Sequence, residues 1–363
     1  MRASINIALF LAVFFSGFAY AEEGESKKID VGVSIPLSGE LAAWGSDIAK
    51  ILEFANREIA GSRFNFVIED DGCDNKKSVS IAHKLTSSGI KYVTGYLCSG
   101  ALLTAAPVYE KSETLVIALG ASSPHISNSG KYIFRTSFND HDGARHLAQY
   151  LAHKGVSKLG VYTEENDYSI AFSESLKISA DALGFQIVEE RIAPGDKDIR
   201  SAILRMQTKD IEGIFINSQG EDGLLTTLKR IREFGIRLPI YSAYSAASRS
   251  FRNEAGILAD GVEVLDLDGS YKMFSSEGQK LWDKYHKEVG NLQSVEWVFP
   301  STVEAVRALK YAIDNPEDLP QSLIDKPFKG TLGNWFFDVN GDLEGWHFYM
   351  RRVEGRELVP VSK

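Results

Sequence analysis

Short β-branched runs alternate with amphipathic helical patterns along most of the chain. Between the strand-like runs 30–35 and 64–68, residues 47–59 place apolar side chains at spacings of three and four. That spacing puts the apolar side chains on one face of a helix. The same alternation continues: strands are expected at 92–95, 115–119, 159–162, 186–190, 213–216, 240–242 and 262–265, and helices at 78–87, 102–111, 144–153, 171–182, 199–208, 222–234, 277–288 and 301–314.

This order of elements predicts an α/β fold. Strand–helix–strand repetition favours a parallel sheet with helices on both of its faces. The alternation of strands and helices resumes after Asp140. The last two predicted helices, 277–288 and 301–314, have little strand between them. We therefore expect two α/β lobes that the chain visits more than once.

The loops that follow the predicted strands share a chemical character. In open parallel sheets, ligands bind beyond the carboxyl ends of the strands. Here those loops carry hydroxyl groups, glycines and aromatic rings, with few formal charges; they are 36–39 and 44–45, 96–100, 120–124, 166–168, 217–220 and 243–245. They are the candidate binding loops.

Ser99 and Ser122 each precede a predicted helix start. A helix N-terminus presents unpaired N–H groups and partial positive charge, which suits an anion. Two such ends could together hold one carboxylate without an arginine. The alternative is that both serines only cap their helices. Trp44, Tyr168 and Tyr244 could likewise be packing residues.

The first residues are typical of an export signal. Arg2 precedes an apolar run over 5–18 and the small-residue ending Ala19-Tyr20-Ala21. This pattern predicts a secretory signal cleaved after Ala21, with an uncleaved anchor helix as the alternative. The remaining chain, roughly 340 residues long, is too long for one core, so two domains are expected.

Charge and cysteine content narrow the class of protein. The formal net charge is −9, or −10 once Arg2 is lost, which argues against a nucleic-acid partner because such a partner needs a basic face. Cys73 and Cys98 both lie in the exported part, where an oxidising compartment permits a disulfide. Two buried free thiols are the alternative. Neither cysteine has the neighbours of a metal site.

Catalytic and metal-binding motifs fail on inspection. Residues 120–124 begin like a nucleophile elbow, but Pro124 takes the place of the final glycine. Residues 338–342 begin like a calcium loop, but Tyr349 stands where the loop needs a glutamate; a hairpin turn at 340–341 is favoured. The acidic pair Asp70-Asp71 is expected in a solvated loop, with a role in binding a ligand as the alternative. We predict no catalytic residue, metal or cofactor.

Several stretches resemble one protein family. They are 31–33, 37–39, 44–45, 70–74, 89–93, 97–99, 132–136 and 337–345. With them the chain resembles the periplasmic leucine/isoleucine/valine-binding proteins of ABC transporters across essentially its whole mature length. The resemblance implies a Cys73–Cys98 disulfide, no enzymatic activity, and delivery of a small amino acid or related carboxylate to a membrane permease.

The resemblance also implies a type I periplasmic binding protein fold. In that fold, two Rossmann-like lobes are joined by three hinge crossings, here expected at 138–141, 265–269 and 335–338, with the ligand cleft between the lobes. The N-terminal lobe would comprise 22–139 plus 268–336, and the C-terminal lobe 140–267 plus 337–363.

The family's binding residues carry over unevenly. Ser99 matches the serine that bonds the ligand carboxylate, and Ser122 keeps a hydroxyl for it in the loop Gly120-Ala121-Ser122. The Gly120 carbonyl would face the ammonium group. The implied ligand-binding residues are Trp44, Leu97, Ser99, Gly120, Ala121, Ser122, Tyr168, Gln219 and Tyr244.

One departure concerns the ammonium group. The family's acidic partner for it falls at Tyr244, which carries no charge. Glu221 or Asp222 could substitute from a neighbouring loop. Otherwise the ligand would lack a standard ammonium group, as an amide, a urea-like compound or an aromatic acid does. A periplasmic enzyme on the same scaffold, or a ligand-sensing partner of a membrane receptor, are the alternatives of other classes.

Overall fold

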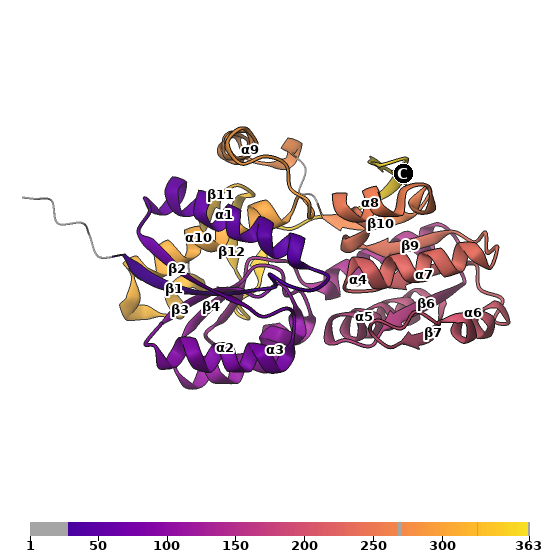
Figure 1. Ribbon diagram of the computed structural model, residues 1–363, viewed down its shortest axis with the longest axis horizontal. Helices are drawn as coiled ribbons and strands as arrows, with labels where there is room; N and C mark the ends of the chain where they lie inside the picture. The colour runs from indigo at the N-terminus through magenta and orange to yellow at the C-terminus, as the bar shows by residue number, and fades with distance from the viewer. Residues whose placement is uncertain (1–27, 268–270, 325, 362–363) are drawn as a thin grey trace, which may run out of the picture.

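The computed structural model describes residues 28–267, 271–324 and 326–361. The predicted signal segment, 1–21, and part of the second predicted crossing, 268–269, lie outside the described residues. Figure 1 shows two lobes side by side, each built on a twisted sheet with helices around it. This confirms the predicted two-lobed α/β architecture. No helix in the described ranges is long and apolar enough to cross a bilayer.

The first lobe is built on a five-stranded, fully parallel sheet in the order β2-β1-β3-β4-β5. Strands β1, β3, β4 and β5 are largely buried, as expected when helices cover both faces, whereas the edge strand β2 is only partly buried. The pairs α1–α10 and α2–α3 lie on opposite faces (Figure 1). The elements are β1 (Ile29–Ile35), α1 (Ala42–Ala60), β2 (Phe64–Asp70), α2 (Asn75–Ser87), β3 (Tyr92–Gly95), α3 (Ser99–Lys111), β4 (Leu115–Ala118), η1 (Pro124–Asn128), β5 (Ile133–Arg135), α10 (Val298–Asp314), η5 (Pro316–Asp318) and α11 (Gln321–Ile324).

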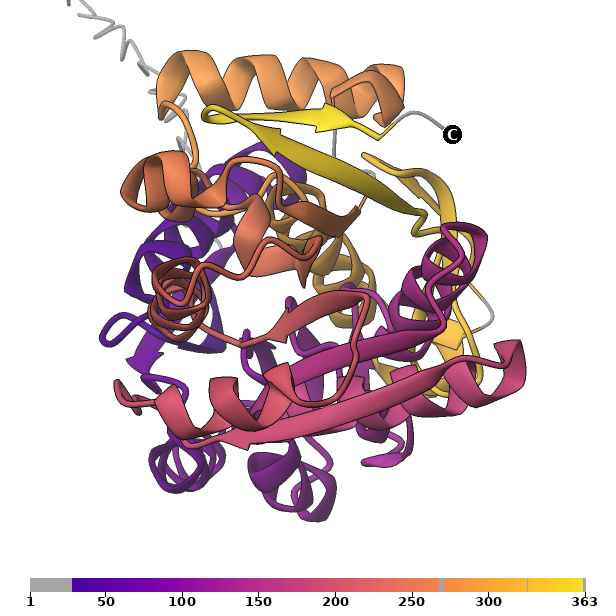
Figure 2. The same ribbon diagram turned by 90° about the vertical axis from the view of Figure 1, so that its right-hand side faces the viewer.

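The second lobe has a seven-stranded sheet in the order β15-β14-β10-β9-β8-β6-β7. Five strands run parallel, and the antiparallel hairpin β14–β15 extends the β10 edge, as Figure 2 shows. The elements are α4 (Asp140–His153), β6 (Lys158–Glu164), α5 (Asp167–Leu183), β7 (Gln186–Ile192), α6 (Arg200–Gln207), β8 (Gly213–Asn217), α7 (Glu221–Glu233), β9 (Ile240–Ala243), η2 (Tyr244–Ala247), α8 (Arg249–Ala255), η3 (Gly256–Ala259), β10 (Glu263–Leu267), β14 (Phe348–Glu354) and β15 (Glu357–Pro360).

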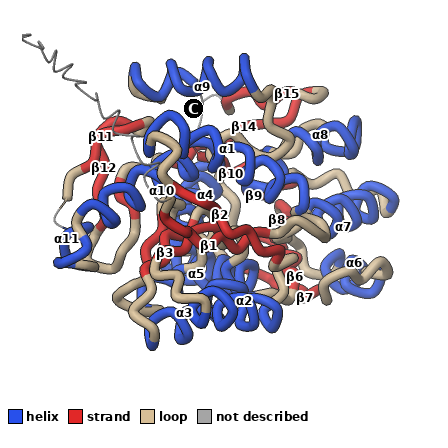
Figure 3. The backbone as a smooth tube through the Cα atoms, turned by 60° about the vertical axis from the view of Figure 1, so that its left-hand side comes forward, coloured by secondary structure: helices blue, strands red, loops and turns tan. Residues whose placement is uncertain are grey.

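Late segments return the chain to the first lobe. After η4 (Tyr271–Met273), helix α9 (Ser276–Glu288) packs on α1, where Tyr285 meets Phe54 edge to face at 5.3 Å. A small antiparallel sheet follows, made of β11 (Phe328–Gly330), β12 (Gly333–Phe337) and β13 (Leu343–Glu344). Figure 3 shows β11 and β12 beside α10 and α11.

The turn between β12 and β13 contains Asn340-Gly341, which confirms the predicted hairpin; Gly341 takes a φ of +79° there. Because Glu344 still pairs with β12, the chain returns to the second sheet between Glu344 and Phe348. This is later than the crossing expected at 335–338. Within the described residues, the other passages run from β5 to α4 and from β10 towards α9.

Candidate functional site

A cavity lies where the carboxyl ends of the two parallel sheets face each other. Loops after β1, β3 and β4 reach it from the first lobe, and loops after β6, β8 and β9 from the second. Its empty space is about 430 Å³, which includes open solvent at the mouth. The lining residues are Leu41, Trp44, Leu97, Cys98, Ser99, Gly120, Ser122, Phe138, Tyr168, Gln219, Tyr244, Ser245 and Trp297.

The structure brings the sequence-predicted ligand residues together, with one exception. All of them line the cavity except Ala121, which is fully buried between Gly120 and Ser122. Sequence reasoning missed Leu41, Phe138, Ser245 and Trp297. Ser245 does lie in a candidate loop, and Leu41 lies between the candidate segments 36–39 and 44–45. Phe138 lies in the expected crossing 138–141, whereas Trp297 carried no signal beyond its aromatic character.

Ser99 is the first residue of α3 and is 1% exposed. Its hydroxyl oxygen accepts hydrogen bonds from the N–H groups of Ser122 at 3.2 Å and Ser123 at 3.1 Å. It therefore joins two loops and does not cap its own helix. Because its oxygen already accepts two bonds, the hydroxyl hydrogen is free to be donated to a ligand oxygen.

The helix N-terminus expected at Ser122 is not that of an α-helix. Ser122 precedes only the five-residue 3-10 helix η1, and that turn is capped by the hydroxyl of Ser123, which accepts from the N–H of His125. The first-turn N–H groups of a full α-helix are available only at α3, whose N-cap Cys98 makes no side-chain bond. The prediction of two converging α-helix ends was wrong at Ser122.

The loop that carries Ser122 is anchored by a buried arginine. Arg135, which is fully buried, donates to the Ser123 carbonyl at 2.9 Å. The same guanidinium forms a two-pronged pair with Asp342, with both distances 2.7 Å. A bidentate pair of this kind is geometrically specific, so the loop is fixed to the β12–β13 turn.

Asp140, which sequence reasoning did not place in the site, stands against Ser122. It is the first residue of α4; its N–H donates to the Ser122 carbonyl at 2.9 Å, and its Oδ2 accepts from the Ser122 hydroxyl at 2.7 Å. Burial raises the pKa of Asp140 to about 7, and the Ser122 bond offsets only part of this effect. Its position at the predicted first crossing was the available signal.

Tyr244 lies beside the same carboxylate. Its hydroxyl is close enough to favour the charged form of Asp140, and a Cβ at Gly143 of α4 would lie 2.4 Å from that hydroxyl oxygen. Yet three of the nine buried side-chain polar atoms that have no hydrogen-bond partner within the described ranges lie here: the Tyr244 hydroxyl, Asp140 Oδ1 and the indole nitrogen of Trp297. Burial raises the pKa of Tyr244 well above its usual value.

Aromatic rings form the walls of the cavity. Phe138 packs on Tyr244 with ring centres 4.5 Å apart and on Trp297 at 5.1 Å. Trp44 meets Trp297 edge to face at 5.9 Å. Tyr168, 8% exposed, completes the second-lobe side.

The two acidic residues that could have substituted for the family's acid do not line the cavity. Glu221 accepts from the Trp44 indole at 2.8 Å and from the Ser250 hydroxyl at 2.9 Å. Asp222 is exposed. Glu221 therefore joins the lobes, because Trp44 belongs to the first and Glu221 to the second.

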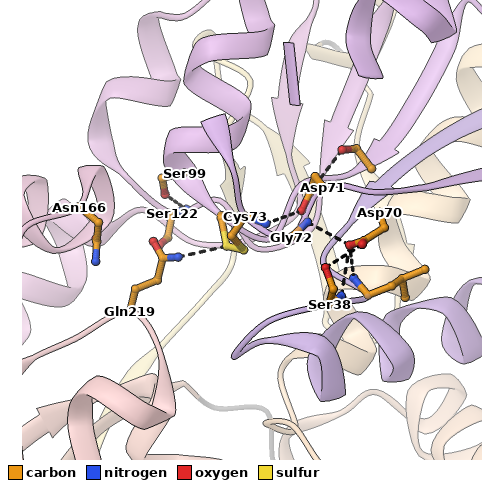
Figure 4. The surroundings of a disulfide bond; sticks show 12 residues. Ser38, Asp70, Asp71, Gly72, Cys73, Ser99, Ser122, Asn166 and Gln219 are labelled. Atoms are coloured by element: carbon orange, nitrogen blue, oxygen red, sulfur yellow. Dashed lines mark hydrogen bonds between the residues drawn. A yellow bond between two sulfur atoms is a disulfide. The ribbon is translucent and has the colours of Figure 1, made fainter. Parts of the chain in front are cut away.

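The Cys73–Cys98 disulfide is present and lies at the edge of the cavity (Figure 4). Across the cleft, the Gln219 amide donates to Cys98 Sγ at 3.2 Å. In Figure 4 Ser99, Ser122 and Gln219 gather on one side of the disulfide, with the Asp70-Asp71 loop on the other.

The Asp70-Asp71 loop is not simply solvated, contrary to the prediction. Asp71 is 1% exposed and accepts from the Ser34 hydroxyl and the Cys73 N–H, both at 2.8 Å. Although burial opposes it, hydrogen bonds from Ser38 and Lys77 hold the pKa of Asp70 well below its usual range. Both carboxylates are therefore used to shape the loops before Trp44 and around Cys73.

Comparison with known proteins identifies similar sequences over almost the whole chain. Residues 28–323 match the model of the periplasmic binding protein family. The Leu/Ile/Val-binding protein homolog 1 of Brucella suis is 26% identical over 95% of this chain and 94% of its own. The leucine-, isoleucine-, valine-, threonine- and alanine-binding protein of Pseudomonas aeruginosa is 25% identical over 94% and 93%.

Solved structures share the fold. A leucine-binding protein from Thermotoga maritima superposes with a TM-score of 0.84 at 18% identity, covering 92% of this chain and 98% of its own. A solute-binding protein from R. palustris in complex with 4-hydroxybenzoate has a TM-score of 0.82 at 19% identity, covering 93% and 96%.

Proposed function

The chain belongs to the periplasmic binding protein family, and we propose that it is the solute-binding component of an ABC transporter that captures an α-amino acid of the branched-chain type. The names of the Brucella and Pseudomonas relatives support this ligand class. In this proposal no covalent bond is made or broken. The output is the closed, ligand-bound form, which docks on a membrane permease.

The observation that carries the proposal is a cavity between the lobes that is lined from both of them. A ligand there contacts Ser99 and Gly120 from the first lobe and Tyr168 and Gln219 from the second. Because those contacts all form only when the lobes are together, the ligand favours the closed arrangement by its differential affinity.

The carboxylate of the ligand is assigned to Ser99. Ser122 donates its hydroxyl to Asp140 and its N–H to Ser99, so it positions these two side chains. The Ser99 hydroxyl has its hydrogen free, and the N-terminal turn of α3 adds partial positive charge. Hydrogen bonds to a charged group contribute about 1.5–3 kcal/mol each. The Gly120 carbonyl would face the ammonium group, with Leu97, Trp44 and the remaining rings around the side chain.

The proposal includes the cellular setting. Residues 1–21 would direct export and be removed after Ala21, which leaves the mature protein in the periplasm. The lobe that begins at residue 22 and the lobe that begins at 140 would then rotate about their connecting segments. Sequencing the N-terminus of the exported protein tests the cleavage site.

A thermal-shift screen tests the ligand class. A ligand that binds only the folded protein raises the melting temperature, by an amount that grows with its concentration relative to Kd. We expect leucine, isoleucine or valine to raise it in a saturable way. A screen in which none of the common amino acids does so would contradict the proposal.

A second candidate is an aromatic carboxylic acid. Five aromatic rings line the cavity, and position 244 carries no charge of its own. The R. palustris neighbour bound to 4-hydroxybenzoate supports this alternative at the level of the fold. It predicts a melting-temperature shift with benzoate or 4-hydroxybenzoate and none with leucine.

A further inference from the structure

The carboxylate of Asp140 is buried without a compensating charge. Its side chain lies wholly inside the protein, with Oδ2 bonded to Ser122 and Oδ1 without a partner in the described structure. An isolated buried charge is expensive, and a partnerless buried polar atom in a native protein calls for an explanation.

The protein does not supply the missing cation. Among the described residues that line the cavity, none is Lys, Arg or His. The guanidinium that acts on Asp140, that of Arg135, is already held by Asp342 and the Ser123 carbonyl. A charge that balances ionised Asp140 would therefore have to come from a ligand; without one, protonation neutralises the group.

Asp140 is not itself a lining residue of the cavity, but Ser122 and Tyr244, which act on it directly, are. Asp140 Oδ1 and the Tyr244 hydroxyl oxygen are both buried and partnerless, and Gly120 lines the cavity next to Ser122's loop. An ammonium group carries three N–H donors and needs this kind of acceptor set. The Ser122 hydroxyl, which donates to Asp140 Oδ2, keeps the carboxylate oriented.

We propose that Asp140 holds the ammonium group of the ligand, in the role that the resemblance assigns to the position occupied here by Tyr244. This inference rests on the proposed function, because it requires an amino acid as ligand. It makes Asp140 a specificity-determining residue, which selects amino acids over the corresponding carboxylic acids that lack the amino group.

Protonation of Asp140 provides a second line of support. Its pKa of about 7 in the empty protein means that it is partly protonated at neutral pH. The groups that act on it are Ser122, Arg135 of β5 and Tyr244 after β9, while Asp140 in turn raises the pKa of Tyr168 of α5. Because a cation favours the charged form, binding should expel the proton, and affinity should fall as the pH drops below 7.

The test compares the wild type with Asp140→Asn, which keeps the shape and the contact with Ser122. Titration calorimetry is run with leucine and with 4-methylpentanoate, which is leucine without its amino group. We expect Asp140→Asn to weaken leucine binding by about 100-fold, as for other buried charge pairs, and to leave 4-methylpentanoate binding unchanged or tighter. The matched control is Asp142→Asn, two residues further along α4, where the Asp142 side chain is 46% exposed and pairs with Arg145.

The outcomes separate this inference from the proposed function. Equal leucine affinity in wild type and Asp140→Asn would overturn the role of Asp140 and leave the proposed function standing. A wild type that binds 4-hydroxybenzoate and no amino acid would overturn both. Should Asp140→Asn fail to fold, calorimetry of the wild type with leucine at pH 6.5 in two buffers of different ionisation enthalpy decides: net proton release supports the inference, and none overturns it.

Discussion

The two sides of the cavity differ in how far their polar groups are already satisfied. On the Ser99 side, the hydroxyl oxygen accepts two N–H groups, and Arg135 fixes the adjoining loop. On the Asp140 side, a carboxylate oxygen and the Tyr244 hydroxyl are buried without partners in the described ranges. The first side is preformed, whereas the second is completed only by a ligand. Substitutions should therefore act differently on the two.

The largest expected effect is on stability at the Asp140 side. In the unfolded chain this carboxyl ionises near its usual value of 3.8, but in the folded, empty protein near 7. Between these values the folded state binds more protons, so stability falls as the pH rises from about 4 to about 7, by up to about 1.4 kcal/mol per pH unit. The melting temperature of Asp140→Asn should lack this slope.

The measurement is the difference in melting temperature between Asp140→Asn and the wild type at pH 4.5, 6 and 8 without ligand. Using the difference removes other carboxyls with raised pKa values, such as Glu40 and Asp266. A difference that stays constant with pH would mean that Asp140 does not titrate in this range.

Ser99→Ala should have the next largest effect, and it should lower both the ligand affinity and the stability of the protein. It removes the acceptor that ties the Ser122–Ser123 loop to α3 and the donor offered to the ligand. The lost bond to the ligand carboxylate, about 1.5–3 kcal/mol, corresponds to about 10- to 100-fold in affinity, measured by calorimetry. The two lost bonds to the loop lower the melting temperature. Ser123→Ala is the matched control, since that hydroxyl only caps η1; the same loss in both variants would count against a ligand contact at Ser99.

Ser122→Ala should weaken binding by about tenfold while leaving the fold intact, because it removes one hydrogen bond at the junction of the two sides. Unchanged affinity by calorimetry would remove Ser122 from the site. The circular dichroism spectrum of the variant checks that the fold is retained.

Tyr244→Phe is expected to have the smallest effect on ligand affinity. The direction in which it changes the melting temperature without ligand is the informative result. It deletes a hydroxyl that has no described partner in the empty protein, so the melting temperature without ligand should stay equal or rise slightly. Affinity for leucine should fall only a few-fold, since one neutral hydrogen bond contributes about 1 kcal/mol. A clear loss of stability without ligand would indicate that the hydroxyl already has a partner.

Much of the fold could be predicted because parallel strands are buried on both faces and stand out as apolar runs. The strand at 92–95 agrees with β3 to the residue, and the helix at 277–288 begins one residue after the start of α9. The three-residue strand β5, the short helix α8 and the late strands β11–β15 were missed. These elements are too short or too mixed in pattern to be recognised without their pairing partners.

Some residues of the candidate site could also be predicted from the sequence, and others could not. Loops that follow parallel strands must meet at one sheet edge, so Ser99, Ser122, Tyr168 and Gln219 could be expected near each other. Asp140 could not, because its role depends on burial and on which hydrogen bonds its neighbours leave unmade. Neither quantity is visible in the order of residues.

The anchoring by Arg135 has a mechanical consequence. Strand β5, the loop of Ser123 and the turn at Asp342 are joined by one fully enclosed guanidinium, and the last passage between the lobes begins shortly after that turn. We therefore expect the first lobe to stay rigid while the second lobe rotates relative to it. Fluorescent dyes on α2 and α7 would report capture of a ligand as a change of distance, whereas dyes on α2 and α10 would stay silent.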